Sequence, residues 1–389
     1  SETVRLELAA APPPEAVADV VERRLRGMSP AAREILQVAA VAGREFDVDL
    51  VLALSQRSED ALLEALDEAV SAGVLTPVQR AGGDWYRFTH SKLAHVLAQA
   101  LNPRRRRKLH HQIAEALEQR GDSPVGTVAW HWYHAEEVAR ASVAARAAAR
   151  SALALHDYDD ALTFAIMAAE TGEAAADKAE AHELRGDALR RLDRHGEAAA
   201  AYARARLGDV TPEAGMVLRR KELRSALVAG IVPPSAAVAE AQKLVAGAVA
   251  LPVGKRAAAE LVLAEALLAA GDHAGTVTAA ERAYHSGLEA GDRALAADAQ
   301  LALGSAQLRA GNAVGAAAPA REAEGTFIQL GDPYGAARAA ALRGAVAAAT
   351  GDRPAARTAL DDAVRQAERA GVTRLVRQFK ERRAELDPP

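Results

Sequence analysis

The residues best suited to metal chemistry are histidines that lie close together in the sequence. His131 and His134 are three positions apart, Glu137 is one turn further, and His110 and His111 precede them. Imidazole and carboxylate groups at such spacing could hold Zn²⁺. Aromatic residues stand among them, however, which indicates a packed helix with buried, hydrogen-bonded histidines. Because the spacing matches no known metal motif, we expect no metal site.

Phosphate chemistry would need a basic run or a glycine-rich loop. The basic run after Pro103 has two interpretations, a phosphate contact on a nucleic acid or nucleotide and a solvated helix face. The Gly-Lys-Arg string at 254–256 lacks the earlier glycine and the Ser or Thr of a phosphate-binding loop. We therefore expect no nucleotide cofactor in this chain alone. The candidate phosphate contacts are Arg104, Arg105, Arg106 and Arg107.

Composition restricts the remaining functions. The chain has no cysteine, which excludes disulfides and thiolate catalysis, and its net charge of -4 gives no general attraction for nucleic acid. Since no catalytic constellation stands out among the charged residues, we expect no catalytic residues and no enzyme activity. No apolar run has the length of a membrane span and no signal peptide is evident at the start. We expect a cytoplasmic protein without a membrane partner.

The elements that would position these residues are repeated helical hairpins. A glycine followed by Asp or Asn recurs at intervals of 40 residues, at positions 271, 311 and 351. Glycine adopts the left-handed conformation that ends a helix, and Asp or Asn caps the next helix. A single hairpin cannot bury its apolar side. Such units therefore stack into a solenoid.

The hairpins follow the tetratricopeptide pattern, in which a small residue on the first helix precedes a small, large, small triplet on the second. Gly304, for example, precedes Ala316, Ala320 and Ala323. The extra length over the usual 34-residue period adds less than about one turn to each helix. We predict about six repeats over residues 144–372. Their triplets begin 37 to 40 residues apart, at Ala161, Ala198, Ala237, Thr276, Ala316 and Ala356.

The N-terminal part predicts a winged helix at residues 15–101, after a proline-containing lead-in at 1–14. Helices are predicted to begin at Glu15, at Ser29-Pro30 and at Ser58. Two strands at 74–78 and 85–89 form a hairpin, the only β structure that we expect. The fold class is therefore all-α, a winged helix with a small β-hairpin followed by a tetratricopeptide-like helical-hairpin solenoid.

Two further segments complete the domain prediction. Residues 102–143 are predicted as a helical connector, with helices at 103–121 and 127–141. Residues 373–389 are predicted as a C-terminal capping helix and tail, because a solenoid needs a polar end.

A winged helix suggests DNA binding through its third helix. That helix carries Glu59, Asp60, Glu64, Asp67 and Glu68 and has no Lys or Arg before its end. Such a surface is repelled by the phosphates of a DNA groove. We expect a protein contact here, and DNA binding is the least favoured hypothesis.

Three segments resemble the region that follows the ATPase domain in bacterial signal-transduction ATPases with numerous domains, a class that includes large ATP-binding LuxR-type regulators and cyclase-linked ATPases. They read LRGMSPAARE at 25–34, AAVAGREF at 39–46 and YRFTH at 86–90, and NPRRRRKLH at 102–110 resembles the connector helix of that class. The resemblance spans essentially the whole chain. It implies a bacterial signalling or transcription regulator in which ATP or ADP is held by an ATPase domain, in cis or in trans.

The resemblance also implies a role for His90. In this class a histidine at the end of the second wing strand touches the β-phosphate of ADP, and by position it is His90, with Arg87 beside it. Without an ATPase domain, His90 would simply cap the following helix. The chain itself lacks the ATPase and the C-terminal LuxR-type helix-turn-helix. Since it also begins at Ser1, we expect a regulatory fragment or a protein that has lost its ATPase.

Three functions are therefore compared. The first is a regulatory arm, in which the solenoid binds a partner or ligand and the winged helix controls the nucleotide state. The second is a free-standing tetratricopeptide scaffold for a peptide or protein, and the third is a DNA-binding regulator. An upstream phosphate-binding loop would favour the first over the second. For a protein or peptide in the groove of the solenoid, the candidate contacts are Arg190, Arg191, Ser305, Arg309 and Arg338.

Overall fold

The computed structural model describes residues 25, 27–80, 83–121 and 123–386. The predicted lead-in at 1–14 and the start of the helix predicted from Glu15 lie outside these residues. Within the described part there are nineteen α-helices and three short β-strands, so the predicted mostly helical character is confirmed. The chain divides into two compact units. Unit 1 comprises residues 1–151 and 163–177, and unit 2 comprises 152–162 and 178–389.

The N-terminal part of unit 1 packs helices against a small antiparallel sheet with strand order β1-β3-β2. Ser29 and Ser58 start their helices as predicted, because their hydroxyls accept the N–H groups of Ala32 at 3.1 Å and Ala61 at 3.3 Å. The elements are α3 (Pro30–Ala42), β1 (Glu45–Asp47), α4 (Val48–Ser55), α5 (Glu59–Ser71), β2 (Leu75–Arg80) and β3 (Gly83–Phe88).

Strand β1 corrects the prediction that the hairpin is the only β structure. Phe46 at its centre pairs with Tyr86 of β3 and is 1% exposed, and its ring lies 5.7 Å from that of Phe88. Burial of this ring between the helices and β3 holds the strand in place. Three residues are too few to show the alternation by which a strand is predicted from sequence.

The rest of unit 1 corrects one predicted helix. The helix expected at 127–141 is interrupted because Glu136 takes a left-handed conformation, with φ of 60°. The N–H of Glu137 then bonds the carbonyl of Trp132 at 3.2 Å, which ends the first helix. No glycine marks this turn in the sequence. The helices are α6 (Ser91–Gln99), α7 (Pro103–Arg120), α8 (Val125–His134) and α9 (Val138–Ala154).

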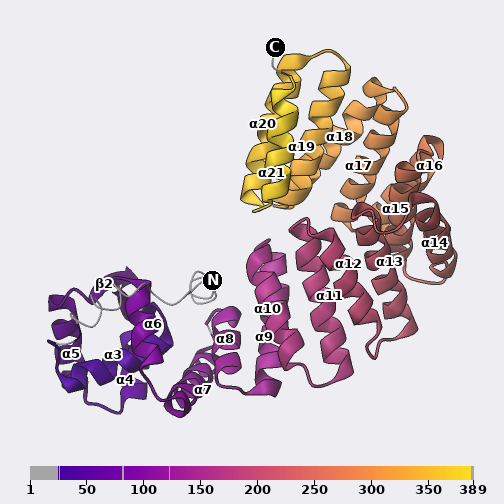
Figure 1. The fold of residues 1–389 in the computed structure, drawn as a ribbon. Helices are drawn as coiled ribbons and strands as arrows, with labels where there is room; N and C mark the ends of the chain where they lie inside the picture. Colours follow the sequence, from indigo (N-terminus) through magenta and orange to yellow (C-terminus); the bar gives the residue numbers. More distant parts are fainter. Residues whose placement is uncertain (1–24, 26, 81–82, 122, 387–389) are drawn as a thin grey trace. The chain divides into compact units, whose positions relative to one another are not determined.

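Most of the remaining helices belong to unit 2, where successive hairpins follow one another along a curved path from α11 to α20 (Figure 1). In each hairpin the first helix has an odd number and the second an even number, and α21 closes the row. The helices are α10 (Tyr158–Thr171), α11 (Ala175–Arg191), α12 (His195–Arg206), α13 (Pro212–Val228), α14 (Pro234–Gly247), α15 (Val253–Ala270), α16 (His273–Glu289), α17 (Arg293–Arg309), α18 (Ala313–Gln329), α19 (Pro333–Ala349), α20 (Arg353–Arg369) and α21 (Thr373–Ala384).

Small residues bring the two helices of a hairpin together, as predicted. Ala316, Ala320 and Ala323 are each 0% exposed. A Cβ on Gly186 would lie 2.5 Å from the ring of Tyr202, so only glycine leaves room for that ring. The helices can therefore approach closely although the core contains few large side chains.

The turns explain why the repeat is clearest in the second half of the chain. Six glycines from Gly271 to Gly371, spaced by 20 residues, end helices with φ between 65° and 85°. Earlier turns use His156 and Asp193, with φ of 59° and 61°. These two residues adopt the left-handed conformation that glycine adopts in the later turns. The turn geometry is therefore the same, although no glycine marks these turns in the sequence. No helix in the described ranges is long and apolar enough to cross a membrane.

Candidate functional site

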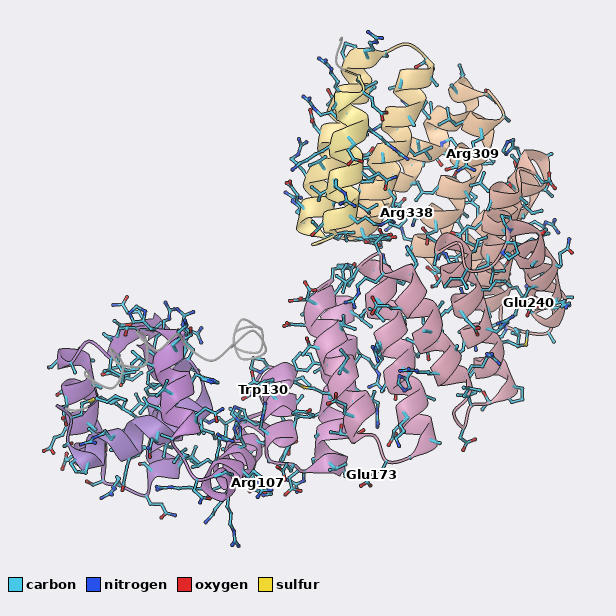
Figure 2. All side chains as sticks on the ribbon, in the orientation of Figure 1. Arg107, Trp130, Glu173, Glu240, Arg309 and Arg338 are labelled. Carbon is cyan, nitrogen blue, oxygen red and sulfur yellow. The ribbon has the colours of Figure 1, made fainter. Side chains whose placement is uncertain are left out.

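Charged side chains from the first helices of successive hairpins meet inside unit 2. Arg224 of α13 donates to Glu265 of α15 at 2.5 Å and to Asp298 of α17 at 3.1 Å. Arg338 of α19, which is labelled in Figure 2, donates to the other oxygen of Asp298 at 2.8 Å. Burial alone would raise the pKa of Asp298, but Arg224 and Arg338 hold it well below its ordinary value. The carboxylate therefore joins three hairpins as a permanent anion.

A second contact links the end of α11 to the start of α19. Arg191, in the last turn of α11, donates to Asp332 at 2.5 Å, although 141 residues separate them. Its guanidinium lies 5.9 Å from the ring centres of both Tyr158 and Tyr334. Asp332 is 3% exposed and caps α19 by accepting the Gly335 N–H at 3.0 Å. Unit 2 therefore curls back, so that its first and fifth hairpins are in contact.

A cavity of about 330 Å³ opens beside these contacts, and we call it the basic cavity. Five of the side chains that line it are cations and one is a carboxylate, so its wall is strongly positive. Leu153 and Tyr158 supply apolar surface. The lining residues are Leu153, Tyr158, Asp187, Arg190, Arg191, Arg220, Lys221 and Arg224.

Three of the five cations are balanced by carboxylates. Arg191 and Arg224 have the partners given above, and Lys221 donates to Asp187 at 2.7 Å and to Glu183 at 2.8 Å. Burial alone would raise the pKa of Asp187, but Lys221 and Arg190 hold it below its ordinary value. The carboxylate that lines the cavity is thus already engaged.

The other two cations, Arg190 and Arg220, form no salt bridge with any residue in the described part of the chain. Burial, together with the positive charges of Arg224 and Arg190, lowers the pKa of Arg220 to about 10. Arg220 therefore remains charged at neutral pH, and Asp187 and Tyr202 compensate its charge only in part.

The predicted groove residues are divided between this site and other places. Arg190, Arg191 and Arg338 belong to the charged network, whereas Ser305 is half-buried on α17 outside the residues that line the cavity. Arg309 is exposed and donates to the carbonyl of Leu268 at 3.4 Å.

Sequence reasoning missed Arg220, Lys221 and Arg224, three cations within two turns of α13. The available signal was the run of cations itself, which stands in the middle of a first helix. The 40-residue step from Asp298 to Arg338 is a second signal, because it places opposite charges at equivalent positions of successive hairpins.

The residues proposed for nucleotide contacts lie in unit 1. His90 is exposed and precedes α6, and its side chain makes no capping hydrogen bond. Arg87 donates to Glu45 at 2.5 Å within the small sheet. In the first turns of α7, Arg106 donates to Gln99 at 2.8 Å and Arg107 pairs with Glu136, while Arg104 and Arg105 are exposed.

The histidines singled out for metal chemistry form a packed cluster. The Nδ1 atoms of His110 and His131 are 3.0 Å apart, and the ring of His134 stacks on His110 at 5.1 Å. His111 instead contacts Glu137 at 3.0 Å. Burial lowers the pKa of His110 to about 2 and that of His131 to about 3. Across the described residues, no group of three or more His, Cys, Asp or Glu is arranged to hold a metal ion.

Comparison with known protein families finds no match. A 131-residue stretch, 33% of this chain, is 30% identical to an uncharacterized protein of Rhizobium meliloti (strain 1021). That stretch covers only 12% of the relative, so the chain spans a small part of the relative's length.

Among solved structures, the Rap protein complexed with competence and sporulation factor is similar with a TM-score of 0.51 and 14% identity, over 73% of this chain and 77% of that one. A signal-transduction ATPase with a tetratricopeptide repeat sensor from Pyrococcus horikoshii has a TM-score of 0.39 and 11% identity, over 88% and 57% of the two chains. Yeast Tom70 has a TM-score of 0.41 and 12% identity, over 95% and 86%. The first likeness shows that the chain has a tetratricopeptide-like helical repeat fold.

Proposed function

We propose that this chain is a protein-interaction scaffold, and that unit 2 binds a segment of a partner protein on its inner, charged side. The observation that carries this function is the basic cavity, formed where α11 and α13 face the inside of the curl. Stacked hairpins offer a continuous surface for such a segment. The similar Rap protein, which was solved in complex with competence and sporulation factor, supports binding by this type of fold.

A random dodecapeptide library panned against the whole chain tests this function. We expect enriched peptides that protect α11, α13 and α15 from hydrogen exchange, because the first helices carry the charged inner surface. The second helices α12, α14 and α16 serve as internal controls. Failure to enrich any peptide, or protection confined to the second helices, would contradict the proposal.

A second candidate function is a regulatory arm for an ATPase domain in cis or in trans, which would hold ATP or ADP. The observation that favours it is His90, an exposed imidazole that follows β3 and makes no capping bond. In this interpretation the N-terminal part of unit 1 is a winged helix. Its α5 exposes Leu63 and Val70, at 46% and 38%, among acidic residues. Such a surface suits a protein contact better than a DNA groove.

The regulatory arm is tested by His90→Ala in a complex or longer protein that includes the ATPase domain. A hydrogen bond from an imidazole to a phosphate contributes about 1.5 to 3 kcal/mol, so ADP release should accelerate by roughly tenfold or more. Substitution of the exposed His285 by Ala is the control. Unchanged nucleotide exchange in His90→Ala would remove the sensing role.

A further inference from the structure

The basic cavity contains positive charge that the described protein does not balance. Arg191, Lys221 and Arg224 each have carboxylate partners, whereas Arg190 and Arg220 have none among the described residues. Both guanidinium groups line the same cavity, and Arg190 also interacts with the hydroxyl of Tyr202. Two like charges held together away from bulk water repel each other, and this arrangement costs stability unless an anion joins them.

The charge and shape of this pair favour one class of anion. A phosphate monoester carries a charge of about -1.5 to -2 at neutral pH, which suits two guanidinium groups that form no salt bridge with the described residues. A single carboxylate would leave one of them unbalanced. Guanidinium groups also match phosphate oxygens in bidentate geometry.

The cavity also has suitable size and walls. Its volume of about 330 Å³ lies at the lower end of the range typical of ligand sites. Leu153 and Tyr158 line the same cavity as the cations and provide apolar surface for the carbon chain that carries the phosphate. An extended segment on the inner side of unit 2 could therefore place one modified side chain in the cavity.

We propose that Arg190 and Arg220 form a binding site for a phosphoryl group, presented by a phosphorylated side chain or by a small phosphate monoester. The site specifies which ligand the proposed scaffold would bind. It rests on the scaffold function only where the phosphate is carried by a protein segment.

Calorimetric titration of the whole chain with inorganic phosphate and with O-phosphoserine tests the site. Arg220→Met should weaken binding of both by about tenfold or more, since a charged hydrogen-bonding group is lost. Without phosphate, the variant should unfold at the same or a higher temperature, because the repulsion from Arg190 and Arg224 is relieved. A residue with a purely structural role would instead lower the unfolding temperature.

Arg219→Met is the matched control on the same helix. Arg219 pairs with Glu240 at 3.0 Å and with Glu222 at 2.8 Å and does not line the cavity, so phosphate binding should be unchanged. Equal phosphate binding by wild type and Arg220→Met overturns the proposal. If Arg220→Met does not fold, Arg190→Met decides in the same titration, and unchanged binding there overturns it.

Three decapeptide libraries, with a fixed central phosphoserine, glutamate or alanine, identify the source of the phosphate. Preference for phosphoserine that is lost in Arg220→Met supports both the site and the scaffold. Arg220-dependent binding of O-phosphoserine without any peptide binding supports the site and contradicts the scaffold. Peptide binding that depends neither on phosphoserine nor on Arg220 keeps the scaffold and overturns the site.

Discussion

At the scale of single residues, burial of His131 makes the stability of the fold depend on the protonation of its imidazole. Its side chain is 2% exposed and faces His110, and the positive charge of His134 acts on it as well. No carboxylate is among the groups that shift the pKa of His131. The folded state therefore accommodates the neutral imidazole only.

This arrangement predicts that unit 1 loses stability in mild acid. The pKa of His131 falls from 6.5 to about 3 on folding, so below pH 6.5 the unfolded chain binds the proton and the folded chain does not. The stabilisation is fully present above pH 6.5 and decreases by about 1.4 kcal/mol for each pH unit between pH 6.5 and the folded pKa of about 3. His131→Gln should give a shallower dependence.

Urea unfolding between pH 7 and 5, followed by tryptophan fluorescence, measures this slope. Trp85, Trp130 and Trp132 all lie in unit 1 and are the only tryptophans of the chain, so the signal reports on that unit. The exposed His285 of unit 2 provides the control variant His285→Gln. An identical slope in wild type and His131→Gln would contradict the assignment.

At the scale of elements, the approach of neighbouring helices depends on particular glycines. A Cβ on Gly335 of α19 would overlap the ring of Phe327 on α18, which is 2% exposed. A Cβ on Gly325 of α18 would meet nothing within 4 Å. The same substitution should therefore have opposite effects at these two positions.

Gly335→Ala should destabilise unit 2 by about 1 to 3 kcal/mol through overpacking. Gly325→Ala should stabilise it by about 0.5 to 1 kcal/mol, because alanine has the higher helix propensity. Thermal unfolding followed by circular dichroism compares both with wild type. If Gly335→Ala is as stable as Gly325→Ala, the close packing of α18 on α19 is wrong.

At the scale of the whole molecule, unit 2 differs from an open solenoid in which each repeat touches only its neighbours. Arg374 of α21 pairs with Asp193 in the turn between α11 and α12, 181 residues earlier. Tyr158, Tyr334 and Leu375 share one apolar cluster. The last helix of the array thus stabilises the first hairpin of unit 2.

Arg374→Ala should therefore loosen a distant segment. We expect faster hydrogen exchange at residues 190–197, because among the described residues the Asp193 carboxylate would then keep its contact with His195, at 2.9 Å, and lose the one with Arg374. Arg377→Ala, on the exposed side of the same helix, should leave exchange there unchanged. Equal exchange rates at 190–197 in both variants would contradict this long-range contact.

The sequence alone determined much of the local structure. Helix starts at Ser29 and Ser58, the glycine turns from Gly271 onward and the buried alanine triplets follow from capping, backbone and packing preferences that act over a few residues. Its selection of Arg190, Arg191 and Arg338 as contacts for a partner stays a prediction, although all three belong to the charged network of unit 2. These features can be predicted from the sequence because each depends on residues within one or two helical turns.

The tertiary structure decided the rest. The strand at Phe46 and the turn at Glu136 form because burial and long-range pairing outweigh weak local preferences. Arg191 pairs with Asp332 only because unit 2 curls and brings distant helices together, and the same arrangement leaves Arg220 without a salt bridge to the described residues. The curvature of unit 2 determines which cations have carboxylate partners. This curvature accumulates from small rotations between successive hairpins, so the sequence of a single repeat does not predict it.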